Sequence, residues 1–311
     1  MSNHLTALLS RAFVAAYVVG GYVRYYSRRI SLRTFIIISL IIAMIAGLTA
    51  NFLLKPQMNG NDALNRGYDL ANNGQLNAAH KAFDDAYQIF RKESYGRGMF
   101  VALGKLGEID ERLSNPREAL FHYDAALRLA QQYNDTGAQI TLFKKHADIK
   151  LRLNRFDAAR AHLYDALKIA QDTENHEQVG LLFTRVGNLE RDIGNDRRAR
   201  FLYRQASDTY QNQPNTAGQA NLNWNLGILE AGVENYDASL REYITARELY
   251  KIQNDTYREA VVVHHMARLE KKLGTERKAA AYYNEAATLY ASIGRNEDVK
   301  SLKTEAAELL S

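Results

Sequence analysis

The sequence predicts an all-α protein: a right-handed α-solenoid of six helix hairpins with a C-terminal capping helix, preceded by a transmembrane helix. An alanine recurs six times at a spacing of 40 residues, from Ala86 to Ala286, and such a spacing is typical of repeat proteins. Within one unit, Ala199, Tyr203 and Ala206 fall on one helix face, because residues at i, i+4 and i+7 lie above one another. Residues 34–54 carry no charge and are mostly apolar, as a membrane span requires.

Composition and charge exclude several classes of protein. With 46% hydrophobic and 24% charged residues, the chain of 311 residues can bury a core. The absence of cysteine excludes disulfides and thiolate metal sites. The net charge is +5, but residues 1–61 hold six basic and no acidic residues, whereas the rest holds 34 basic and 35 acidic residues. The positive charge therefore belongs to the N-terminal segment and does not indicate a nucleic-acid-binding body.

Residues 1–33 form a basic segment with an apolar helix expected over 12–23, and residues 34–54 form the expected transmembrane helix. A helix of this length measures about 31 Å, against a hydrocarbon core of about 30 Å. The apolar run is too long and too far from the N-terminus for a cleaved secretory signal, which favours an uncleaved anchor. Four arginines between residues 24 and 33 lie just before the span and only Lys55 lies just after it, so the C-terminal body is expected outside the cytoplasm.

These features predict a single-pass inner (cytoplasmic) membrane protein with its body in the periplasm. An N-terminus with arginine and serine but no acidic residue also fits a mitochondrial presequence, which makes the mitochondrial inner membrane the alternative. A second span over residues 5–23 stays open. It would place Arg11 inside the membrane at a cost of about 3 kcal/mol, and it would leave the body on the same side.

After a linker at 55–61, six repeats of 40 residues are expected over 62–296. Three columns support the register: residue 79 and its equivalents are alanine except for Ser239, residue 83 and its equivalents are aromatic except for Leu163, and residue 67 and its equivalents are glycine or alanine. Small residues let two helices approach closely while the aromatic ring fills the space between them. Turn signals separate the two helices of a unit at Gly74, Ser114 to Pro116, Asn154, Gly194 and Gly274.

Local signals at the helix ends agree with this register. In the segment SNPRE, Asn115 can cap a helix that Pro116 begins, with Glu118 in the capping-box position. Residues 297–311 are expected to form the capping helix, because their apolar residues share one face. These residues are Val299, Leu302, Ala306 and Leu309.

At these columns the sequence resembles the tetratricopeptide repeat (TPR) family. Gly187, Ala199, Tyr203 and Ala206 match the small, alanine, aromatic and alanine positions 8, 20, 24 and 27 of that family's repeat. The unit here has 40 residues instead of 34 and lacks the usual proline, which is similar to the longer-helix variety found in cell-polarity adaptors and bacterial peptide-sensing regulators. The resemblance covers residues 60–311. It implies the fold, while function depends on the site.

The resemblance also implies a partner-binding groove lined by the first helix of each repeat. Carried over residue by residue, the groove positions with Asn225 added give the candidate partner-binding residues Lys144, Arg152, Asn188, Arg191, Asn221, Trp224, Asn225 and Arg268. The same positions also include Asp148, Thr184, Ile228, His264 and Lys271. Trp224 can either anchor a partner in the groove or be buried between repeats.

Part of the family grips a peptide's C-terminal carboxylate with a fixed set of lysine, asparagine and arginine residues. Asn188 and Asn225 match that set, whereas Thr184, Val261 and His265 do not. The carboxylate clamp is therefore not expected.

The sequence shows no catalytic, metal or cofactor motif. Phosphate-binding glycine loops, zinc-protease motifs and nucleophile elbows are absent. The eight histidines are scattered, and no ligand set is evident at helical spacing around His122, His162 or the pair His264 and His265. We expect no enzyme, no cofactor and no metal site.

Two functions stay open. The first is a membrane-anchored scaffold or assembly factor, held in the bilayer by 34–54, that binds protein or peptide segments of a membrane-associated complex through its concave groove. The second is a sensor whose groove closes on a small peptide. The anchor favours the scaffold, because a diffusible sensor gains nothing from being fixed in a membrane. The mixture of cations, amides and apolar surface in the groove suits an acidic, partly apolar partner segment.

Overall fold

The computed structural model describes residues 59–212 and 215–310, which contain thirteen α-helices and no strand. The chain divides into two compact units, and Gly60–Ser311 forms the second. Among the residues that the structure describes, no helix combines the length and the apolarity needed to cross a membrane. The predicted span 34–54 and the apolar segment 12–23 lie outside the described residues.

The helices follow one another at a spacing of 20 residues, so two helices make one 40-residue unit. The first and last helices have 13 residues, and the eleven between them have 17 each. They are α3 Gly60–Asn72, α4 Leu76–Lys92, α5 Gly96–Arg112, α6 Pro116–Gln132, α7 Thr136–Arg152, α8 Phe156–Asp172, α9 His176–Asp192, α10 Asp196–Asn212, α11 Thr216–Gly232, α12 Tyr236–Ile252, α13 Thr256–Lys272, α14 Glu276–Ser292 and α15 Asn296–Glu308.

A left-handed residue ends almost every described helix. The backbone φ is positive at residues 74, 94, 114, 134, 154, 174, 194, 234, 254, 274 and 294. At Gly194, for example, the amide donates to the Arg191 carbonyl at 2.9 Å and the next amide, of Asn195, donates to the Glu190 carbonyl at 2.7 Å. This is the Schellman arrangement, which satisfies carbonyls that the helix end leaves free. All five turn signals within the predicted hairpins fall on such residues.

The starts of the helices differ between the two halves of a unit. Side chains of Asp135, Asn175, Asn215 and Asp255 accept a hydrogen bond from the amide three residues later, at 2.8–3.2 Å, and so cap α7, α9, α11 and α13. Pro116 begins α6 as predicted, but Asn115 makes no side-chain capping bond, so the predicted capping box is wrong. Asn195 is the equivalent residue two repeats later. Its side-chain amide donates a hydrogen bond to the buried carboxylate of Glu190 at 2.8 Å.

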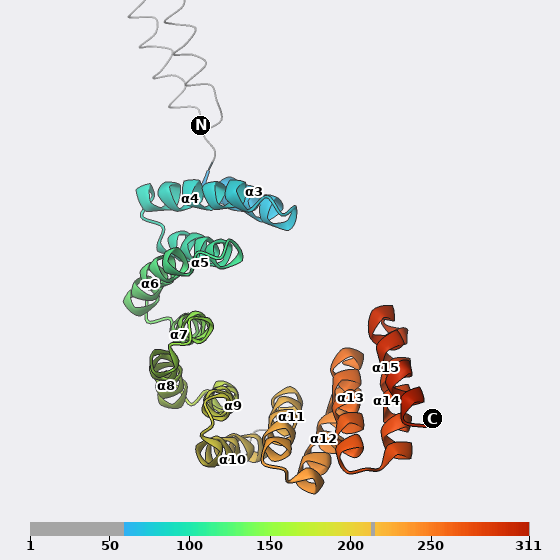
Figure 1. Cartoon of the computed structure of the whole chain (residues 1–311). Helices are drawn as coiled ribbons and strands as arrows, with labels where there is room; N and C mark the ends of the chain where they lie inside the picture. The colour runs from blue at the N-terminus through green and yellow to red at the C-terminus, as the bar shows by residue number, and fades with distance from the viewer. Residues whose placement is uncertain (1–58, 213–214, 311) are drawn as a thin grey trace, which may run out of the picture. The chain divides into compact units, whose positions relative to one another are not determined.

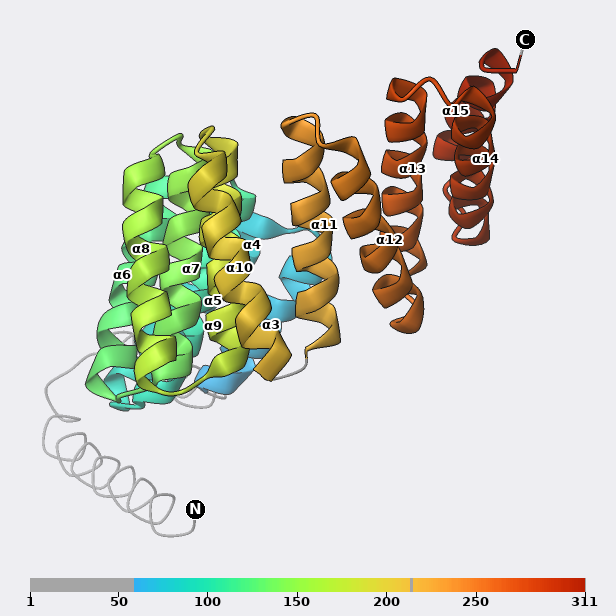
Figure 2. The same cartoon turned by 90° about the horizontal axis from the view of Figure 1, so that it is seen from below.

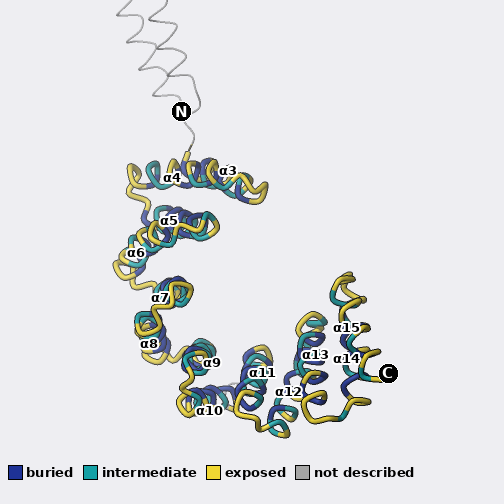
Figure 3. Tube along the Cα trace, in the orientation of Figure 1, coloured by how far each residue is buried: buried dark blue, intermediate teal, exposed yellow. Residues whose placement is uncertain are grey.

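Within each hairpin, the small column packs against the aromatic column. The Tyr203 ring lies over Gly187, where an added Cβ would meet a ring carbon at 2.5 Å. Gly67, Gly107 and Gly227 meet the rings 16 residues later in the same way. The alanines of the 40-residue register, Ala86 to Ala286, are all fully buried. The core therefore lies between facing helices, while the turns are mostly exposed (Figure 3).

Successive helices of the second unit pack side by side along the chain (Figure 1), and Figure 2 shows α11, α12, α13 and α14 following one another in the view from below. The first helices of the pairs, α5, α7, α9, α11 and α13, lie on the inner side of the curve that this unit follows in Figure 1. Helix α15 closes the array by burying Leu302 and Ala306 against α13 and α14, with Val299 and Leu309 beside them. The right-handedness of the solenoid stays a prediction.

Candidate partner-binding face

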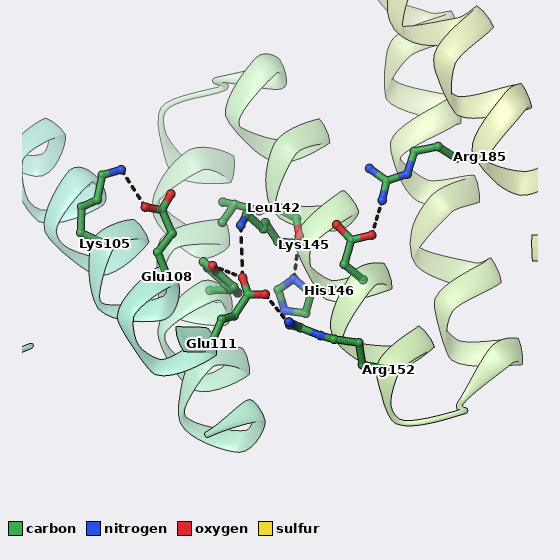
Figure 4. A network of polar contacts seen from close by, with 10 residues as sticks. Lys105, Glu108, Glu111, Leu142, Lys145, His146, Arg152 and Arg185 are labelled. Carbon is green, nitrogen blue, oxygen red and sulfur yellow. Dashed lines mark hydrogen bonds and ion pairs between the residues drawn. The ribbon is translucent and has the colours of Figure 1, made fainter. Parts of the chain in front are cut away.

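The candidate partner-binding residues belong to α7, α9, α11 and α13. Together with α5, these helices form the surface that we call the inner face. In repeats 2 to 4 this face carries pairs of opposite charge that join neighbouring first helices. Glu111 on α5 accepts from Lys145 at 3.2 Å and from Arg152, both on α7 (Figure 4). Tyr123 donates to the same carboxylate at 2.6 Å. Arg152 is therefore engaged within the protein.

These contacts shift the pKa values of Glu111 and Tyr123. Burial raises the pKa of the Glu111 carboxyl, but the hydrogen bond from Tyr123, the charge of Lys145 and the hydrogen bonds from Lys145 and Arg152 outweigh it, so the pKa is lowered. Burial and the bond to Glu111 raise the pKa of the Tyr123 hydroxyl. Glu111 is thus held as a carboxylate between two cations.

The next pair of first helices is joined in the same way. Asp148 on α7 accepts from Arg185 on α9, and the Lys144 ammonium donates to the Gln178 amide oxygen at 3.0 Å. Burial, followed by the charge of Arg185, lowers the pKa of Lys144. Lys144 and Asp148, both expected to face a partner, serve as contacts between repeats 3 and 4.

Four of the predicted residues form one connected network across α9 and α11. Arg191 donates to the Asn225 side-chain oxygen at 2.9 Å, and the Asn225 amide donates to the Asn221 carbonyl at 2.7 Å. Asn188 accepts from the Tyr203 hydroxyl at 2.7 Å, and the same hydroxyl lies 3.4 Å from Arg191. Asn225 is buried. These residues lie on the neighbouring first helices α9 and α11, and their polar groups hydrogen-bond within the protein.

This network uses both residues that match the carboxylate clamp. Asn188 and Asn225, the two residues that match it, are both engaged internally. Thr184 is buried, and its hydroxyl donates to the Gly180 carbonyl at 2.9 Å.

Repeats 5 and 6 present a different surface. A pocket of about 220 Å³ lies between α11 and α13, and it is lined by Ile228, Ala231, Tyr243, His265, Arg268, Leu269 and Lys272. Arg268 and Lys272 are exposed and form no ion pair within residues 59–212 and 215–310. Beside the pocket, Trp224 is half-buried, with its ring 4.7 Å from that of His265 and 5.3 Å from that of Tyr243. The pocket combines an apolar floor with two cations that form no ion pair among the described residues, of which Lys272 lies 5.8 Å from the centre of the Tyr236 ring.

A larger pocket, of about 650 Å³, lies at the other end of the array, between the start of α5 and the end of α6. Its lining includes Tyr95, Phe100 and Tyr133, with Arg97 and Asp135 as its charged residues. It carries one charge of each sign, so it has less electrostatic preference for a partner than the pocket between α11 and α13.

Sequence reasoning missed Glu111, Lys145 and Arg185. A signal was available for the two cations, because Lys105, Lys145 and Arg185 stand at the same place in three successive repeats, and acidic residues follow three positions later at Glu108 and Asp148. Glu111 lies outside these columns. A column of cations close to a column of acids indicates that these charges form ion pairs within the protein.

The paired antiparallel helices define the class, an α-helical repeat protein. A family model described as tetratricopeptide repeat matches residues 138–212, which correspond to repeats 3 and 4. The match supports the tetratricopeptide repeat family. No curated protein matches the sequence.

Solved structures share the fold. BtubC (BKLC) from P. vanneervenii is similar with a TM-score of 0.62 and 20% identity, over 70% of this chain and 92% of that one. The apo form of RapI gives a TM-score of 0.57 and 11% identity, over 80% and 97%. A STAND signal transduction ATPase with a tetratricopeptide repeat sensor, from Pyrococcus horikoshii, gives 0.58 and 14%, over 87% of this chain and 45% of that one. At these identities the likeness concerns the fold alone.

Proposed function

We propose that the chain is a protein-binding scaffold that takes an acidic, partly apolar segment of a partner protein into the pocket between α11 and α13. The observation that carries this proposal is the contrast along the inner face. In repeats 2 to 4 the charged groups are paired across repeats, whereas Arg268 and Lys272 border an apolar pocket without an ion pair among the described residues. Unpaired cations beside apolar surface attract acidic partners and orient them, while the apolar floor supplies contact area.

The size and the charges of the pocket also indicate which side chains the partner segment would carry. Ile228, Leu269 and the Tyr243 ring offer room for one apolar side chain, since about 220 Å³ exceeds the volume of a leucine or phenylalanine side chain. A carboxylate on either side of that residue would reach Arg268 or Lys272. His265 is held neutral at pH 7, because burial, followed by the charges of His264 and Arg268, lowers its pKa to about 4.

The test begins with a photo-crosslinking residue placed at Ile228 of the full chain in its source cells, which captures the partner for identification. The partner's acidic segments are then titrated against the chain and against the Arg268→Ala, Lys272→Ala double variant. We expect at least tenfold weaker binding, about 1.4 kcal/mol, and a weaker interaction at higher salt. The matched control is Arg277→Ala, Lys278→Ala, two exposed cations on α14.

Equal affinity of the double variant and the unaltered chain would contradict the site. Loss of binding in the control variant alone would move the site to the second helices. A partner captured at Phe100 instead of Ile228 would favour the larger pocket at α5.

The proposal includes a membrane anchor at residues 34–54 and a body outside the cytoplasm, supported by the charge asymmetry around that segment. A reporter that is active only outside the cytoplasm, fused after Ser311, is expected to be active. Activity of a cytoplasm-only reporter at the same place would overturn this topology.

A second candidate function is a sensor that closes on a small peptide. It draws support from a Rap protein in complex with Competence and Sporulation Factor, which is similar in fold with a TM-score of 0.52 and 14% identity. A sensor is expected to become more compact on binding, whereas a scaffold keeps its dimensions. Small-angle scattering of the chain with and without the captured segment distinguishes the two.

A further inference from the structure

Asp110, near the end of α5, is a buried carboxylate between two imidazoles. Its side chain is 3% exposed. One oxygen lies 3.3 Å from His80 Nε2 on α4, and the other lies 2.7 Å from His122 Nδ1 on α6. The two rings lie 5.8 Å apart. Helices α4, α5 and α6, which belong to two repeats, therefore bring one carboxylate and two imidazole nitrogen atoms close together.

The equivalent residues in later repeats are neutralised differently. Glu190 stands two repeats after Asp110, and its carboxylate accepts from Arg160 Nε at 2.7 Å. Glu230 accepts from Arg200 Nε at 3.0 Å. Each arginine precedes its acid by 30 residues, which is also the spacing from His80 to Asp110. Repeats 3 and 4 thus supply an arginine to the buried acid of the following repeat, whereas repeat 1 supplies His80 to Asp110 of repeat 2.

Asp110 therefore has two imidazoles beside it and no arginine or lysine in an ion pair among the described residues. A buried carboxylate is costly unless a cation or several hydrogen bonds compensate it. Neutral imidazoles donate hydrogen bonds but carry no charge, whereas a divalent cation bound by the same three residues would compensate the carboxylate. Imidazole nitrogen with one carboxylate is a donor set that suits zinc.

The geometry is close to that of a metal site. Ligand atoms about 2.0–2.1 Å from a tetrahedral zinc ion lie about 3.3 Å from one another, and the His80 to Asp110 distance already has this value. The possible ligand atoms of the three residues all lie within 4.8 Å of one another. The side chains of His80 and His122 are 34% and 17% exposed, so an ion can reach them from solvent.

We propose that His80, Asp110 and His122 form a binding site for zinc or a chemically similar divalent transition-metal ion, with a fourth position open to water. The ion would join α4 of repeat 1 to α5 and α6 of repeat 2, and so stabilise the interface between these repeats. Sequence reasoning did not find the site because its ligands lie on three helices and share no column of the repeat.

The test uses the repeats themselves to design a variant. His80→Arg places at residue 80 the side chain that residues 160 and 200 already have, so Asp110 gains a guanidinium partner and the fold needs no metal. The full chain, freed of metal with a chelator and kept in mild detergent, is titrated with zinc chloride at pH 7.5 by calorimetry. We expect one saturable site with a micromolar or lower Kd. The melting temperature should rise by about 5 °C at a hundredfold excess of zinc over Kd.

In His80→Arg, zinc affinity is expected to fall at least tenfold and the rise in melting temperature to disappear, while the metal-free melting temperature is unchanged or higher. His176→Ala, which removes an exposed histidine on α9, should bind zinc like the unaltered chain. If His80→Arg fails to fold, His122→Gln keeps a polar group beside Asp110 and carries the same expectation. No saturable binding at 100-micromolar zinc, or equal binding by the ligand variants, would overturn the site.

Discussion

Lowering the pH from 7.5 to 5 is expected to destabilise repeats 5 and 6 through His265. This imidazole packs edge-on against Trp224, with ring centres 4.7 Å apart, and lies 6.0 Å from the Tyr243 ring. Burial, followed by the neighbouring charges of His264 and Arg268, lowers its pKa to about 4 in the folded protein. A histidine in an unfolded chain has a pKa of about 6.5.

The order of these two pKa values decides whether acid lowers or raises the free energy of unfolding. Because the folded-state pKa is lower, the unfolded chain binds more protons between pH 4 and 6.5, and the free energy of unfolding falls as the pH decreases through this window. At pH 7.5 neither state is protonated to a large extent. At pH 5 the unfolded chain is almost fully protonated at this residue and the folded chain is not, which corresponds to a loss of about 2 kcal/mol.

Urea unfolding of the chain and of His265→Gln at both pH values measures this loss. The variant is expected to lose about 2 kcal/mol less than the unaltered chain between pH 7.5 and 5, whereas His176→Gln, at an exposed site, should show the unaltered pH dependence. An NMR titration reads the His265 pKa directly. A value near 6.5, or the same pH dependence in His265→Gln, would refute the reasoning.

The remaining predictions concern packing and buried charge. Ala206→Leu is expected to overpack the junction of α10 with α9 and α11 and to cost about 1–3 kcal/mol, because Ala206 is fully buried. Ala281→Leu, at an exposed position, should cost less than about 0.5 kcal/mol, and equal melting temperatures for these two variants would show that the repeat register is wrong. Arg200→Ala is expected to cost about 1–3 kcal/mol because it leaves the Glu230 carboxylate, whose side chain is 11% exposed, without its cation. Arg204→Ala on the exposed side of α10 is its control, and equal urea midpoints for the two arginine variants would contradict the role of the ion pair.

The hairpins could be predicted from the sequence because their determinants are local and repeated. Gly187 and Tyr203 are 16 residues apart in one hairpin, and the ring needs the space that glycine leaves. The turns could be found at Gly74, Gly194 and Gly274, since glycine adopts positive φ at little cost. Equivalent turns at Glu174 and Glu234 carry no such signal, because only the register places them.

The polar contacts of the candidate site could not be predicted in the same way. Arg152 and Glu111 are 41 residues apart, and whether they meet depends on the offset between neighbouring repeats. The columns place both residues on the inner face, but they do not tell which side chain reaches which neighbour. The same limit applies to Arg200, whose side chain on a second helix donates to Glu230 of the next repeat.

The left-handed residues at the helix ends show where whole repeats could be added to the chain or removed from it. Ser114 and Asn154 both adopt positive φ after a 17-residue helix, and each is followed by one residue and then another 17-residue helix. Deleting residues 115–154 would join Ser114 to Arg155 and keep a positive-φ residue followed by one residue before the next helix. One 40-residue unit could therefore be removed without changing the turn. Gain or loss of whole units at such joints would change the length of the array without a change in any single helix.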